Sequence, residues 1–163
     1  MSYLRYFMTL ALVVWIGGII FFAFVVAPTL FAVLPSTQLA ASVVAPTLGK
    51  LHIIGLVCGL IFLFSSLLES RLCYRDFQPL SSRNFFVMLM MAVTCISQFF
   101  LTPKLAALRA QLGSISTLPI THPGRVAFDS LHVWSTRLEG AILLMGLLVI
   151  YLVAASSIQD TRR

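Results

Sequence analysis

The sequence predicts an all-α integral membrane protein, a bundle of four antiparallel transmembrane helices that forms one domain over residues 1–163. Hydrophobic residues make up 60% of the chain and charged residues 10%, with a mean hydropathy of +1.01. In an ordinary soluble domain charged residues make up about a quarter of the chain. Four apolar stretches are long enough, or nearly long enough, to cross a bilayer as helices. Four such spans with short connections leave no room for a separate soluble catalytic domain.

The four stretches cover roughly residues 6–27, 51–68, 85–101 and 133–155. Transmembrane β-strands would be about 10 residues long and would alternate in polarity, and none of these stretches alternates. The first stretch is longer than the hydrophobic region of about 7–15 residues in a secretory signal, so we expect it to stay as a span. Residues 28–49 hold three prolines and no charge, which predicts an interfacial connection between the first two spans.

The net charge of +6 arises from 11 Lys and Arg against 5 acidic residues. Most of the basic residues flank the predicted spans, where they contact phospholipid head groups, so we expect the bilayer and not nucleic acid to be their partner. The positive-inside rule predicts a multi-pass protein of the inner (plasma) membrane with both termini cytoplasmic. The six residues counted inside are Arg5, Arg71, Arg75, Arg83, Arg162 and Arg163, and the four counted outside are Lys50, Lys104, Arg109 and Arg125.

A polar stripe opens the fourth span. Arg125, Asp129, His132, Thr136 and Glu139 follow one another in steps of three or four residues, so they share one helical face, with Arg137 to one side. Ionisable groups facing lipid are costly, so the stripe is expected to face the bundle or an outward vestibule. The alternative is that Asp129 with Arg125, and Arg137 with Glu139 or a neighbouring span, are ion pairs that only anchor a helix end.

Two histidines mark candidate ligands. His52 and His132 each lie near the start of a span, and in an antiparallel bundle these starts are at similar depth. Such a pair could ligate haem b axially or share a copper ion, and an interfacial histidine is otherwise a hydrogen-bonding residue that needs no cofactor. Gln98 lies on a stripe of the third span that points toward the same polar end. The predicted polar pocket therefore contains His52, His132, Gln98, Asp129, Arg137 and Glu139.

Several short motifs resemble a known family. Trp15-Ile-Gly-Gly18, Ala27-Pro-Thr-Leu-Phe31, Gly49-x-x-His52, Pro103, Leu108-Arg109 and Phe128-x-x-Leu-His132-x-x-Ser135 look like the small four-span family of unknown function that includes the transmembrane-protein-205 group. More distantly, the Trp-x-Gly-Gly helix and the histidines near helix ends are similar to the CopD copper-resistance proteins and the HemJ-type protoporphyrinogen oxidases. That likeness implies that His52 and His132 are the positions to test for metal or haem.

Two functions follow from the sequence. In the first, the protein binds haem or a metal ion in its outward-facing pocket as a small redox or metal-handling subunit. In the second, the same polar residues line a solute path or dock a partner, and the protein is a cofactor-free transport or accessory subunit of a larger membrane complex or a homo-oligomer. No phosphate-binding loop, GxSxG, HExxH or Ser-His-Asp pattern occurs, so the sequence does not decide whether the protein is an enzyme.

Overall fold

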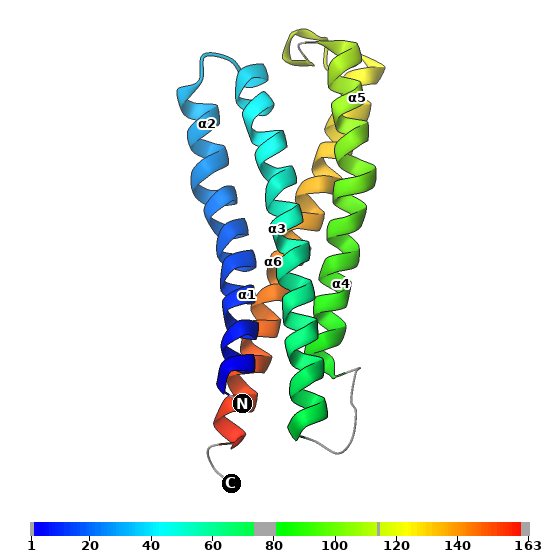
Figure 1. Cartoon of the computed structure of the whole chain (residues 1–163). Helices are drawn as coiled ribbons and strands as arrows, with labels where there is room; N and C mark the ends of the chain where they lie inside the picture. The colour runs from blue at the N-terminus through cyan, green and yellow to red at the C-terminus, as the bar shows by residue number, and fades with distance from the viewer. Residues whose placement is uncertain (1, 74–80, 114, 161–163) are drawn as a thin grey trace.

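The prediction of an all-α membrane bundle is confirmed by the computed structural model, which describes residues 2–73, 81–113 and 115–160. In Figure 1 the chain runs upward through its first helical segments, downward through one long helix, upward again through the next segments and downward through the last helix. Arg75, Arg162 and Arg163, used in the orientation count, lie outside the described residues. The elements in chain order are α1 (Ser2–Phe21), η1 (Phe22–Val26), α2 (Ala27–Val33), α3 (Thr37–Cys73), α4 (Ser82–Ile96), η2 (Ser97–Leu101), α5 (Thr102–Leu112), η3 (Ile115–Thr117) and α6 (Pro123–Asp160).

The helices are longer than the apolar stretches that predicted them. Among the described residues four helical segments could cross a membrane: Tyr3–Val33, Thr37–Leu72, Ser82–Leu112 and Pro123–Ala155. At 1.5 Å per residue, segments of 31 to 36 residues are about 47–54 Å long, which exceeds the hydrocarbon core of about 30 Å. Their ends therefore reach into the head-group layers.

Residues 28–49, predicted to form an interfacial connection, are mostly helical. Only a short break at Leu34, Pro35 and Ser36 separates α2 from α3. Leu34 is extended, with ψ 142°, as expected of a residue that precedes proline. The Ser36 hydroxyl accepts a hydrogen bond from the Leu39 backbone N–H at 3.2 Å and so caps α3. Pro46 lies inside α3, where the helix continues past it.

Two π-helical segments interrupt the spans, and each ends two residues before a proline. In η1 the Ala27 N–H bonds the Phe22 carbonyl, and in η2 the Thr102 N–H bonds the Ser97 carbonyl. Pro28 and Pro103 follow directly, and each lacks the N–H that would bond the carbonyl four residues earlier. Widening the turn lets both helices continue through the proline. Such π-bulges occur frequently at functional sites.

The core is centred on Trp15, which is 2% exposed. Its indole ring lies against the backbone of α3 at Gly55, and its far edge approaches Gly59 beside the Met91 side chain. Glycines at these positions let α1 and α3 approach closely, as small residues do in membrane bundles. The remaining buried side chains of this core are aliphatic, sulfur-containing or aromatic: Met8, Ala11, Leu12, Ile16, Ile19, Cys58, Phe62, Val87, Met90, Ile142 and Val149.

Candidate functional site

A buried polar cluster joins three of the four spans. His52 on α3 is 3% exposed, and both of its ring nitrogens have side-chain partners. Nδ1 lies 2.8 Å from Oε1 of Gln98 in η2, and Nε2 lies 2.5 Å from Oε1 of Glu139 on α6. The structure thus brings together three residues of the predicted pocket.

The partners of His52 determine which of its ring nitrogens carry a proton. The Gln98 carbonyl oxygen can only accept, so Nδ1 donates to it. Between Nε2 and Glu139 there must then be one further proton, which belongs either to an imidazolium facing a carboxylate or to a carboxylic acid facing a neutral imidazole. Both forms have the same net charge of zero. In either form the cluster holds one proton between His52 and Glu139, which we call the proton store, and without it the cluster would carry a net negative charge.

A cavity of about 350 Å³ lies beside this cluster, at the end of the bundle that is opposite both chain termini, which we call the distal end (Figure 1). Its volume falls within the range of about 300–1,000 Å³ that is typical of small-molecule sites. All four spans contribute to its wall. The lining residues are Ile19, Phe22, Ala23, Ala27, Phe31, Ala41, Val44, Ala45, Leu48, Leu51, Thr102, Leu105, Ala106, Arg109, His132, Ser135, Thr136 and Glu139.

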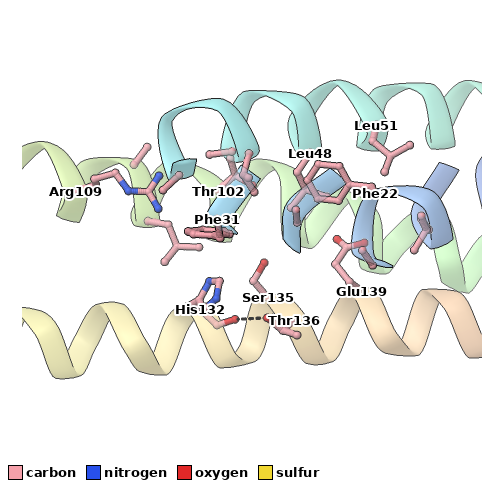
Figure 2. Close-up of a pocket in the computed structure, with 18 residues that line it drawn as sticks. Phe22, Phe31, Leu48, Leu51, Thr102, Arg109, His132, Ser135, Thr136 and Glu139 are labelled. Atoms are coloured by element: carbon pink, nitrogen blue, oxygen red, sulfur yellow. Dashed lines mark hydrogen bonds between the residues drawn. The ribbon is translucent and has the colours of Figure 1, made fainter. Parts of the chain in front are cut away.

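The charged groups of the cavity lie at its two ends. Figure 2 shows Arg109 at one end, Glu139 toward the other, and Phe22, Phe31 and Leu48 between them. Glu139 belongs to both the cavity and the buried cluster, and its side chain is 17% exposed against 3% for His52. Glu139 therefore links the cavity to His52.

Arg109 is a half-buried cation of α5. Its guanidinium carbon lies 5.3 Å from the centre of the Phe128 ring, and no described carboxylate lies within ion-pairing distance of it. Phe128 also stacks on His132, with ring centres 6.2 Å apart and planes 5° apart. Arg109, Phe128 and His132 together form an amphipathic rim at the distal end of the cavity.

Asp129 and Arg137, also predicted for the pocket, do not join the cluster. The Asp129 side chain is 59% exposed and forms a 3.7 Å ion pair with Arg125 one turn away. Arg137 is exposed, and its guanidinium lies 5.6 Å from the Trp134 ring centre. The alternative considered from the sequence paired Arg137 with Glu139 or with a neighbouring span; in the structure Glu139 pairs with His52. The stripe of α6 thus divides into an exposed charged part and a part that faces the bundle.

The two predicted ligand histidines are separated in the structure. His132 precedes Glu139 by seven residues on α6, which places it about 10 Å along the axis from the residue that contacts His52. Both nitrogens of His52 are engaged, and within the described part of the chain no three His, Cys, Asp or Glu side chains gather as a metal site would require. As arranged, these side chains do not fit a shared haem or copper ion, and cofactor binding stays a prediction.

A second polar cluster, which the sequence reasoning did not identify, lies at the opposite end of the bundle. Glu69 on α3 is 2% exposed and accepts bonds from Arg5 Nε at 2.7 Å and Arg83 Nη2 at 2.9 Å. Beside it, the Ser66 hydroxyl donates to the Asn84 side-chain oxygen at 2.7 Å. The signal for this cluster in the sequence is Glu69, an acidic residue near the end of an otherwise apolar span. Two other spans carry an arginine, Arg5 and Arg83, at the same end of the bundle.

Comparison with known proteins gives one match. A family model described as a domain of unknown function, DUF4149, matches residues 10–114, which is more than half of the chain. The chain belongs to the DUF4149 family. No curated protein and no solved structure matches.

The DUF4149 match is consistent with the predicted small membrane family of unknown function, and it spans α1 to α5 apart from the first residues of α1. His52, Gln98 and Arg109 lie within it, whereas His132 and Glu139 lie beyond its end. The more particular likenesses to the transmembrane-protein-205 group, CopD and HemJ stay expectations from the motifs.

Proposed function

We propose that the protein binds a small amphipathic molecule in the distal cavity and couples that binding to protonation of the Glu139–His52 pair. It would act as a carrier or as a subunit of a larger membrane complex, without a haem or metal cofactor. The observation that carries this proposal is the position of Glu139, which lines the cavity and also contacts a buried histidine at 2.5 Å.

The coupling follows from charge balance. A ligand that brings negative charge into the cavity favours the form of the pair that holds its proton, because two like charges in a low-dielectric site repel each other. A ligand that brings positive charge favours the form of the pair that has lost its proton. In either case the occupancy of the cavity and the proton on the pair influence each other.

The two π-helical segments support a functional role for this region. Phe22 and Ala23 of η1 line the cavity, and Gln98 of η2 bonds His52. Both interruptions therefore lie next to the same site, although they belong to different spans.

The proton store can be tested without knowing the ligand. Infrared spectra of the purified protein, recorded over a pH series, report a protonated carboxyl group through its carbonyl-stretch band. The form with the proton on Glu139 gives a carboxyl band that disappears in Glu139→Gln and persists in Asp129→Asn, which removes an exposed carboxylate of the same helix. The imidazolium form gives no carboxyl band and is reported instead by imidazolium ring bands that are lost in His52→Ala. A band that survives Glu139→Gln unchanged would show that the titrating acid lies elsewhere and would overturn the proposal.

The orientation belongs to the same proposal. With both termini cytoplasmic, as the basic residues of the sequence predict, the distal cavity would open on the outer side of the inner membrane. The ligand would then be taken from the outer leaflet or from the space outside it.

A further inference from the structure

The depth of the cavity in the bilayer restricts what it can bind. Charged residues define two levels along the bundle: Arg5, Glu69 and Arg83 at the terminal end, and Lys50, Lys104 and Arg137 toward the distal end. Lys50 and Glu69 are 19 residues apart on α3, about 28 Å, which matches the hydrocarbon core of about 30 Å. The bilayer core therefore lies between these two levels.

The cavity spans the distal boundary of that core. Phe22, Leu51 and Glu139 lie near the boundary, whereas Arg109 lies more than a helical turn beyond Lys104, near the end of α5. Arg109 and the apolar wall formed by Phe31, Ala45 and Leu48 thus lie on the head-group side of this boundary, and only the end of the cavity at Leu51 and Glu139 reaches the depth of the acyl chains. The cavity therefore offers a mainly apolar surface next to the head-group layer.

The wall of the cavity combines the cation of Arg109 with mainly apolar side chains. Arg109 contributes a positive charge that no described acid neutralises, while most of the other lining residues are apolar. Five alanines among them, Ala23, Ala27, Ala41, Ala45 and Ala106, leave room between the spans. His132, Thr136 and Phe31 are exposed, so the cavity is open to the surroundings of the bundle.

We infer that the ligand is a single-chain anionic amphiphile, with its charged head at Arg109 and its chain along Phe31, Leu48 and Phe22 toward Glu139. The inference deepens the proposed function by naming its ligand class. A carboxylate and a phosphate head share the chemistry that a guanidinium recognises, since both accept two parallel N–H bonds.

The test is equilibrium binding of radiolabelled dodecanoate to the full chain in nanodiscs of zwitterionic lipid, with binding to empty nanodiscs subtracted. We expect saturable binding at one site per chain. Unlabelled dodecyl phosphate should compete, and dodecanol and dodecyltrimethylammonium, which share the chain but not the negative head, should not. The relative strength of dodecyl phosphate and unlabelled dodecanoate shows whether a phosphate or a carboxylate head is preferred.

Three variants locate the site. Arg109→Gln should raise the Kd of dodecanoate at least about tenfold, because it removes the charge-assisted bonds to the head. Arg137→Gln removes an exposed arginine outside the cavity and should leave the Kd unchanged. Ala45→Phe fills the space for the chain and should weaken binding even though Arg109 is retained.

Equal competition by dodecanol, or an unchanged Kd in Arg109→Gln, would overturn this inference. The two proposals fail separately. If binding requires Arg109 but is identical at all pH values, proton coupling is wrong and the ligand class stands. If the infrared band of Glu139 titrates but no anionic amphiphile binds, the ligand class is wrong and the proton store stands.

Discussion

His52 Nε2 and Glu139 Oε1 lie 2.5 Å apart although the two residues are 87 positions apart in the sequence. The contact connects α3 to α6 and places a proton-holding pair next to a cavity. Because His52 also contacts Gln98, three spans must assemble before the whole three-residue cluster exists. The central claim is that this pair responds to whatever occupies the cavity.

Glu69→Gln is expected to destabilise the bundle markedly. The change weakens two charge-assisted hydrogen bonds to a side chain that is 2% exposed, at a cost of about 2 kcal/mol. Asp129→Asn removes an equivalent charge from an ion pair that is 59% exposed on the acid side, where the cost is about 0–1 kcal/mol. Thermal unfolding of both variants in one detergent measures the difference. Equal decreases in unfolding temperature would contradict a stabilising role of the buried Glu69 contacts.

Gly55→Ala should lower the unfolding temperature because the new Cβ would lie 2.7 Å from the Cδ1 and Cε2 atoms of the buried Trp15 ring. Overpacking of this kind costs about 1–3 kcal/mol. Gly17→Ala is the matched control, since no atom lies within 4 Å of its new Cβ. If both variants unfold at the same temperature as the parent protein, close packing of α1 on α3 is not a source of stability.

An optical spectrum and elemental analysis of the purified protein decide the cofactor question. Since His52 is engaged on both nitrogens, we expect no Soret band and no stoichiometric copper, iron or zinc. A Soret band or a bound metal that is lost in His52→Ala and in His132→Ala would instead support the haem or metal function predicted from the histidine pair.

Reporter fusions at the two termini test the orientation. The excess of basic residues at the terminal end predicts that both reporters are active on the cytoplasmic side. Periplasmic activity at both ends would place the cavity on the cytoplasmic face of the membrane, and the ligand would then come from inside the cell.

The sequence predicted the fold because apolar length and charge scarcity are sufficient to identify transmembrane helices. The predicted spans were too short because proline was taken as a helix boundary. In the structure Pro46 lies within α3, and Pro28 and Pro103 follow π-helical turns. A proline inside a continuing apolar run was the available signal for those interruptions.

The site was predicted in part. Helical periodicity placed Glu139 on the polar face of α6 and Gln98 on a stripe directed to the same end. It could not show that Asp129 lies outside the part of the bundle where the helices pack together. Periodicity tells which face of a helix a residue occupies, but not whether a neighbouring helix makes contact at that position. Arg109 entered the orientation count and a family motif but not the predicted pocket, since its role depends on a cavity that exists only when α2, α3, α5 and α6 are assembled.

The number of protons exchanged per dodecanoate bound tests the central claim most directly. Calorimetric titrations at one pH in two buffers of different ionisation heat give that number from the difference in observed heats. At a pH where part of the Glu139–His52 pairs has lost its proton, the account predicts net proton uptake in the parent protein and none in Glu139→Gln, provided that the variant still binds, because the incoming anion draws a proton onto the deprotonated pairs. Equal proton uptake in the two proteins would contradict it.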